Sequence, residues 1–376
     1  MTVKKSQIIT EAKPHTIKKF EVIETYIKSW AQKLMLNRAC NGLIYIDCMC
    51  NSGVYRDLDG NIVYGSPVRV AEALRDVANT YREKMVYMYL NDINEARIVE
   101  LRKHLPEEES NFKIVTSVND ANDLLETIGP QLDETSHYHY FLLYDPYDAS
   151  IDWKALLPFF RYWGEVMINH ALQDPIRAIT SAKSNTAREK YEHTYLQKFE
   201  KLLPYGSDKK AYERRIADII NYVKGKREYF VASFPFYNRK GSLQYDLIHC
   251  TSNVEGFKLY KNTAWKVFGG KSAARLKEPC LQYELDFSSL KGYSVPTDEN
   301  CFGIYDIAKY VQSTFAGQKD VPLDEIWNIL DYHPIFPSGA FRKEIKRDLK
   351  DYFEATSRMI TDKETGKRQQ VMSFTD

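Results

Sequence analysis

The stretch Ile44-Tyr45-Ile46-Asp47-Cys48-Met49-Cys50-Asn51-Ser52-Gly53 joins an apolar strand to a loop of small residues. The strand covers 43–47, and Gly65-Ser66-Pro67 signals the next helix, with Ser66 predicted as its N-cap and Pro67 as its first residue. Small residues after such a strand let a ligand approach the backbone at the carboxyl edge of a sheet, and asparagine tolerates a positive φ. The stretch favours a nucleotide or adenosyl site. An ordinary turn after a buried strand is the alternative.

Predicted strands and helices alternate along the chain. Apolar residues in steps of three and four predict a first helix over 16–35, and a polar turn at 238–241 between two apolar runs predicts a hairpin with an antiparallel last strand. The predicted strands are 43–47, 85–90, 112–116, 138–144, 165–169, 229–236 and 243–251, and the helices between them are 68–77, 95–104, 121–128 and 153–160. Repeated strand–helix units favour an α/β fold with a Rossmann-like methyltransferase sheet, mostly parallel with an antiparallel last strand.

The chain is predicted to divide into two domains. Residues 1–270 form the Rossmann-like domain, with a helical basic insertion at about 175–228, and 271–300 form a connector. Beyond it, three short helices (304–315, 323–330 and 340–352) and two strands (356–360 and 369–374) are the parts of a winged-helix module over 301–376.

Composition excludes several classes of protein. With 44% hydrophobic and 27% charged residues and a net charge of +1, the chain is neither disordered nor polybasic. It contains no apolar run long enough for a membrane span, and its first residues lack the apolar core of a signal peptide. Six scattered cysteines without a CxxC pair predict reduced thiols in the cytoplasm. The histidines have no metal-ligand spacing, so no metal site is expected, and P-loop and GxSxG motifs are absent.

Acidic residues follow two further predicted strands. The second strand ends in Asn91-Asp92, and an acid at this place can bind both ribose hydroxyls of an adenosyl ligand; a helix N-cap is the alternative. The fourth strand ends in Tyr144-Asp145-Pro146-Tyr147-Asp148, which partly matches the Asp/Asn-Pro-Pro-aromatic sequence of amino-methyltransferases. There the carboxylate and a prolyl carbonyl hold the target amine and the aromatic ring stacks on a flipped base. A rigid turn is the competing interpretation.

Basic residues gather in three places. His15, Lys18 and Lys19 lie at the start of the first helix, where they either approach a ligand carboxylate or are solvated. Residues 177–228 have a surplus of six basic residues interleaved with tyrosines, which is either a surface that follows a phosphate backbone or a solvated helix face. In the C-terminal module, a recognition helix and a basic wing would carry the DNA-binding residues Arg342, Lys343, Lys346, Arg358, Lys367 and Arg368. Acidic residues are interspersed, and winged helices also dock proteins.

An ordered set of motifs resembles the three-Cys-motif partner (TcmP) family. The set runs through His15-Thr16 with Lys18, Tyr26 and Trp30; Tyr45-Ile46-Asp47 to Gly53; Tyr55 with Gly65-Ser66-Pro67; Asp92 with Arg97; and Asp145-Pro146-Tyr147 with Trp153. The resemblance covers about residues 14–270, and the C-terminal module resembles the extension of some members. The family's FAGPG reads Met49-Cys50-Asn51-Ser52-Gly53 here, and its DPYG reads DPYD.

The resemblance implies an S-adenosylmethionine (SAM) methyltransferase-type domain that works beside a separate three-Cys-motif, radical-SAM-like phage protein. Our first hypothesis is a SAM-dependent methyltransferase-like protein acting on nucleic acid, DNA rather than RNA, at a base amino group. Its cofactor residues would be Lys18, Asp47, Cys48, Asn51, Gly53 and Asp92, and its catalytic residues Asp145, Pro146 and Tyr147. The alternatives are a degenerate fold that serves as a DNA- and protein-binding scaffold, favoured by the two lost glycines, and a site for another nucleotide ligand.

Overall fold

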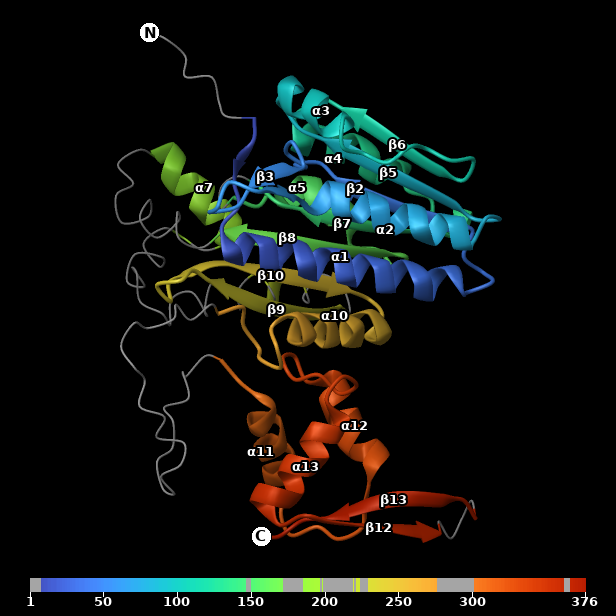
Figure 1. Cartoon of the computed structure of the whole chain (residues 1–376), viewed down its shortest axis with the longest axis vertical. Helices are drawn as coiled ribbons and strands as arrows, with labels where there is room; N and C mark the ends of the chain where they lie inside the picture. Colours follow the sequence, from blue (N-terminus) through green and yellow to red (C-terminus); the bar gives the residue numbers. More distant parts are fainter. Residues whose placement is uncertain are drawn as a thin grey trace.

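The computed structural model describes residues 8–146, 150–171, 185–196, 198, 219, 221–223, 229–275, 301–361 and 366–376. Within these residues the chain forms one seven-stranded sheet and two three-stranded sheets. The large sheet belongs to the N-terminal part and one small sheet to the C-terminal part (Figure 1).

The large sheet has the predicted layout. Its strands are β2 (Gly42–Asp47), β5 (Met85–Asn91), β6 (Phe112–Ser117), β7 (Tyr138–Tyr144), β8 (Gly164–Ala171), β9 (Phe230–Tyr237) and β10 (Leu243–Thr251). They lie in the order β6-β5-β2-β7-β8-β10-β9, the first five parallel and β10 antiparallel to both neighbours. The mostly parallel sheet with an antiparallel last strand is therefore confirmed, and it is consistent with a Rossmann-like methyltransferase fold.

Helices cover both faces of this sheet because side chains alternate along each strand. Tyr45 and Phe141 point into the larger core, which also contains residues of α1 (Pro14–Met35), α2 (Ser66–Thr80), α3 (Glu95–Arg102) and α10 (Val254–Val267). Ile46 and Leu142 point into a second core with residues of α4 (Ala121–Ile128), α5 (Trp153–Leu156) and α7 (Asn185–Tyr195). Figure 1 shows α1, α2 and α10 along the same side.

Some details differ from the predictions. Gly65, not Ser66, is the N-cap of α2: its carbonyl accepts the first helical bond, from Arg69 N at 3.1 Å, so the helix begins one residue earlier. The helix expected over 153–160 is α5 followed by a 3₁₀ turn, Leu157–Phe159. Two features were not predicted from the sequence: α10, and a small sheet of three very short strands, β1 (Thr10–Glu11), β3 (Val54–Arg56) and β4 (Ile62–Tyr64).

The C-terminal module has the three predicted helices and the terminal hairpin. They are α11 (Ile304–Thr314), α12 (Leu323–Tyr332), α13 (Arg342–Phe353), β12 (Thr356–Thr361) and β13 (Arg368–Ser373), with β11 (Val321–Pro322) added to the hairpin. The module lies beyond α10, at the end of the molecule opposite α3 (Figure 1). The fully buried Lys261 of α10 donates to the carbonyls of Leu330, Asp331 and His333 at 2.8, 2.8 and 2.6 Å, which joins the module to the sheet domain.

Three further observations concern membrane-spanning helices, metal ligands and the cysteines. None of the helices in the described ranges is long and apolar enough to cross a membrane. Across the same residues, no three His, Cys, Asp or Glu side chains are grouped so that they could hold a metal ion. The cysteines of the described chain are free thiols, at positions 40, 48, 50, 250 and 301.

Candidate functional site

The loop after β2 folds back on itself through two left-handed residues. Asn51 has φ 57° and Gly53 has φ 66°. The Asn51 side-chain oxygen accepts the Ser52 N–H at 2.7 Å, a local bond that stabilises asparagine in this conformation. At Gly53, a Cβ would lie 2.6 Å from Leu101 and 2.9 Å from Val68, so only glycine fits. Asn51 and Gly53 therefore meet the backbone requirement that the sequence pattern predicted.

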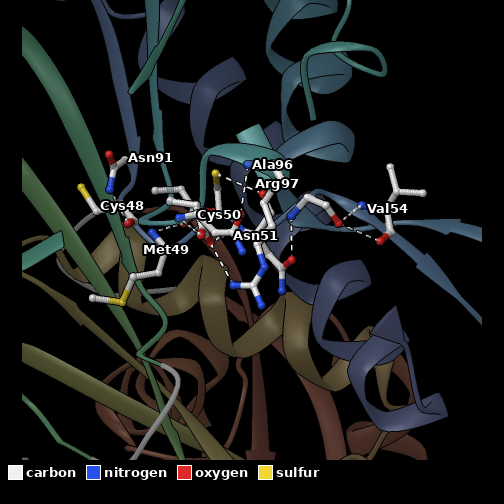
Figure 2. A network of polar contacts seen from close by, with 12 residues as sticks. Cys48, Met49, Cys50, Asn51, Val54, Asn91, Ala96 and Arg97 are labelled. Carbon is white, nitrogen blue, oxygen red and sulfur yellow. Dashed lines mark hydrogen bonds and ion pairs between the residues drawn. The ribbon is translucent and has the colours of Figure 1, made fainter. Parts of the chain in front are cut away.

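The end of β5 holds this loop in place, as Figure 2 shows. The Asn91 amide donates to the carbonyls of Cys48 and Asn119, both at 3.0 Å. The Asp92 carboxylate accepts from Asn51 N at 3.1 Å and from Asn94 N at 2.9 Å, and Arg97 Nη1 lies 3.5 Å away. The Asp92 side chain is wholly buried. Asp92 thus binds the loop of its own chain, and a ribose reaches its oxygens only if one of these groups moves.

Asp47 lies at the end of β2, with only 1% of its surface exposed. Its Oδ1 accepts the Met49 N–H at 3.2 Å. Burial, with the nearby charge of Asp145, raises the pKa of Asp47 to about 8, while the Met49 N–H and Lys19 act in the opposite direction. Near neutral pH this carboxyl is mostly protonated, which makes it a hydrogen-bond donor as well as an acceptor.

Asp145, at the end of β7, is the centre of a second polar group. Lys19 Nζ and Asn169 Nδ2 each lie 2.6 Å from one of its two carboxylate oxygens. Asn169 is 6% exposed, and its own Oδ1 has no hydrogen-bond partner in the part of the chain that the structure describes. Pro146 follows Asp145 at the same edge, whereas Tyr147 lies outside the described residues. A buried acceptor without a partner costs free energy. Within the described residues, Asn169 Oδ1 is such an acceptor.

The first helix covers this group with Lys19 rather than Lys18. Lys19 is buried, and its Nζ also lies 5.2 Å from the centroid of the Tyr245 ring. Lys18 instead pairs with Glu21 at 2.6 Å on the half-exposed side of α1. The predicted cofactor residue Lys18 therefore lies outside this group. Lys19 precedes Ile23 and Tyr26 at helical spacing, on the same buried stripe, and that periodicity is the signal by which the sequence could have identified it.

Cys48 and His15 complete the neighbourhood. Cys48 packs into the second apolar core, away from Asp47, and burial raises the pKa of its thiol. His15 is buried beside Tyr245, whose hydroxyl donates to the His15 carbonyl at 2.8 Å. Burial, together with Lys13 and Lys19, lowers the pKa of His15 to about 4, so its ring is neutral at pH 7 and adds no positive charge.

The basic residues of the C-terminal module lie in different surroundings. Arg342 stacks over Trp327 with its guanidinium 5.0 Å from the ring centroid, and Arg358 pairs with Asp320. Lys343 is exposed on α13 and Lys346 is half-buried on the same helix. Lys367 and Arg368 are exposed at the hairpin, next to the 362–365 turn, which lies outside the described residues.

Most of the basic 175–228 insertion lies outside the described residues. Within the part that is described, Tyr191 and Tyr195 of α7 are buried in the second core, and Tyr222 packs edge-on against Trp153 at 4.7 Å. These three tyrosines therefore form part of the packing of the domain and are not a stacking surface for bases.

Comparison with known proteins gave solved structures alone, since no family model and no curated protein matches the chain. An O-methyltransferase from Bacillus cereus in complex with SAH has 12% identity and a TM-score of 0.31, covering 61% of this chain and 80% of its own. Human methyltransferase-like protein 13 in complex with SAH has 8% identity and a TM-score of 0.31, covering 69% and 97%. The O-methyltransferase TomG from Streptomyces achromogenes, in complex with SAM, has 13% identity and a TM-score of 0.29, covering 67% and 93%. At such low identities and TM-scores, nothing about this chain is inferred from them.

Proposed function

We propose that the chain is a SAM-dependent methyltransferase-like protein that acts on a base amino group of nucleic acid. The observation that carries the proposal is the convergence of Asp47, Asp92 and Asp145 at the carboxyl ends of β2, β5 and β7. In the strand order, β5 and β7 flank β2 on opposite sides, so Asp47 and Asp145 border the point where the direction of the winding reverses. Open α/β sheets bind their ligands at such points.

The residues present fit an adenosyl ligand once the loop has shifted. The loop turns through the left-handed residues Asn51 and Gly53, and Gly53 has no side chain to obstruct a ligand. Asp92 would accept the ribose hydroxyls after exchanging a bond now made to Asn51 N or Arg97. SAM supplies an activated methyl group on a sulfonium, so the chain's own contribution is positioning. Asp145 and the Pro146 carbonyl would accept N–H bonds of the amine and direct its lone pair toward the methyl group, with Tyr147 stacked on the base.

The first test is calorimetric titration of SAM into the full chain, with Asp92→Ala as the variant and Asp59→Ala, an exposed aspartate of the β3–β4 turn, as the control. Micromolar binding that is lost only in Asp92→Ala supports the site. Transfer of radiolabelled methyl from SAM to duplex DNA, single-stranded DNA and RNA then identifies the acceptor. Transfer that survives Asp145→Ala unchanged would remove Asp145 from the mechanism.

We also propose that 301–376 form a winged-helix module that binds DNA through α13 and the hairpin. The exposed Lys343 and the half-buried Lys346 lie on α13, and exposed Lys367 and Arg368 lie on the hairpin. Fluorescence anisotropy of a labelled duplex should show weaker binding and a shallower salt dependence for Lys343→Glu/Lys346→Glu. Lys309→Glu, on the exposed side of α11, is the control. Equal binding by all three proteins would place the DNA on another surface, and absence of binding by the parent protein would assign the module to protein docking.

One observation favours the second candidate, a degenerate methyltransferase fold that serves as a scaffold. The buried Asp92 carboxylate is engaged by Asn51 N and Asn94 N, which closes the ribose position. If the folded protein binds no SAM, we would assign the chain this role, in the cytoplasm, with DNA and the three-Cys-motif, radical-SAM-like protein as its partners. Co-purification of that protein with the full chain, and its dependence on residues 301–376, would then test the assignment.

A further inference from the structure

A cavity of about 340 Å³ lies on the sheet face opposite α1 and α2. Its strand residues are Ile44 of β2, Tyr87 and Tyr89 of β5, and Tyr138 and Tyr140 of β7, whereas Asp47, Asp92 and Asp145 lie at the ends of these strands on the other face. The cavity and the candidate site are therefore independent. Its volume is within the range of small-molecule sites, roughly 300–1,000 Å³.

Half of the residues that line the cavity are aromatic. The aromatic lining residues are Tyr87, Tyr89, Tyr138, Tyr140 and Trp163. Strand register places Tyr87 and Tyr140 on either side of Ile44, so their rings project from one face. Tyr140 is fixed by a 2.7 Å bond from its hydroxyl to the Phe159 carbonyl. Tyr138 lies over Gly42, where a Cβ would come within 2.5 Å of its ring, and its centroid is 6.1 Å from that of Tyr87.

The segment 131–136 forms the rest of the wall and is tied to the domain at both ends. Arg161 donates to the carbonyls of Leu132 and Gly129 at 2.7 and 3.2 Å. The Asn41 amide donates to the Ser136 carbonyl at 2.9 Å. Because both ends of the segment are held by protein groups, the cavity is largely formed before any ligand enters, which reduces the entropy cost of binding.

The charge of the lining is negative. Among the described residues that line the cavity, Asp133 is the one that is charged at neutral pH, since hydrogen bonds from Thr135 lower the pKa of its carboxyl. The cations nearby are already engaged: Arg161 binds carbonyls, and Lys113, beside Tyr87 on β6, lies 3.6 Å from Glu108. Aromatic rings with a carboxylate attract cations, and the ring faces hold alkylammonium groups best because these are weakly hydrated.

We propose that this cavity is a binding site for a small organic cation with a quaternary or tertiary ammonium group. The rings of Tyr87, Tyr138 and Trp163 would surround the alkyl groups, and Asp133 would contribute long-range attraction. Nothing in this assignment depends on SAM binding, so the two proposals can fail separately.

The test compares two probes of nearly the same shape by calorimetry on the full chain. Choline carries the charge, and 3,3-dimethylbutan-1-ol replaces its nitrogen by carbon. A cation–π site predicts that choline binds at least about ten-fold more tightly than the alcohol. Equal affinities, or no binding of choline, would overturn the proposal.

Variants locate the binding. Tyr138→Phe keeps the ring and should keep choline binding, whereas Tyr138→Leu should weaken it about ten-fold. Tyr352→Leu, an exposed tyrosine of the C-terminal module, is the control and should change nothing. Thermal unfolding of each variant establishes that it is folded. If folded Tyr138→Leu and Trp163→Leu both bind choline like the parent protein, the cavity is not the site and the proposal is wrong.

Discussion

Asp47 offers the most direct test of the electrostatics of the candidate site. Burial and Asp145 raise the pKa of its carboxyl from 3.8 to about 8. Between these two values the folded protein holds a proton that the unfolded chain has released. The folded state therefore loses stability as the pH rises through this interval, the usual sign for an acid whose pKa is raised by folding.

The substitution Asp47→Asn removes this titration and keeps the shape of the side chain. The amide oxygen can still accept the Met49 N–H, which now lies 3.2 Å from Oδ1. A difference of one proton between the folded and unfolded states corresponds to about 1.4 kcal/mol per pH unit. We expect the free energy of unfolding of the variant, relative to the parent, to increase by about 3 kcal/mol from pH 5 to pH 7.

Urea unfolding followed by tryptophan fluorescence at pH 5, 6 and 7 measures this difference. The contributions of titratable groups that the variant and the parent share cancel when the two free energies of unfolding are subtracted. Asp246→Asn is a matched control, because Asp246 is also buried, on β10, and burial raises its pKa to about 7. Both variants should gain stability with pH, but only Asp47→Asn should alter SAM binding. A stability difference for Asp47→Asn that is constant across the three pH values would refute the protonated state of Asp47.

Two further predictions concern the loop after β2 and the contact between the sheet domain and the C-terminal module. Gly53→Ala should lower the free energy of unfolding by about 1–3 kcal/mol, because its Cβ would meet Leu101 and Val68 at a left-handed φ. Thermal melting measures this loss, and an unchanged melting temperature would contradict it. Lys261→Met should cost about 3 kcal/mol in urea unfolding, because three carbonyls lose their donor. Lys258→Met, at a partly exposed ion pair one turn earlier, should cost less, and equal losses would contradict the structural role of Lys261.

The acidic residues at the strand ends could be predicted from the sequence because one rule of parallel sheets applies to all three. Parallel strands bring their carboxyl ends to one edge, so Asp47, Asp92 and Asp145 could be placed together from strand limits alone. The positive φ at Asn51 followed from its residue type in a loop of small residues. These predictions needed only local patterns and the period of the strands.

Pairs between distant elements could not be predicted in this way. Contact of Lys19 with Asp145 depends on how α1 crosses the sheet, and contact of Asp145 with Asn169 depends on β7 and β8 being neighbours. The docking of Lys261 on the end of α12 depends on an interface between the two parts of the chain. In each case residue type gave no indication of the partner, and Lys18 was predicted where the structure has Lys19.

Buried polar groups in this chain serve two distinct purposes, which their hydrogen bonds distinguish. Lys261 is wholly buried, and its Nζ donates hydrogen bonds to three carbonyls, so these bonds hold two parts of the chain together. Among the described residues, Asn169 Oδ1 and the Tyr45 hydroxyl are buried without a hydrogen-bond partner, and both residues lie on the same sheet face as Asp47 and Asp145. Natural chains retain such costly groups mainly where a ligand completes them. This pattern is what the proposed function requires of the edge formed by β2, β7 and β8, where a bound ligand would supply the missing partners.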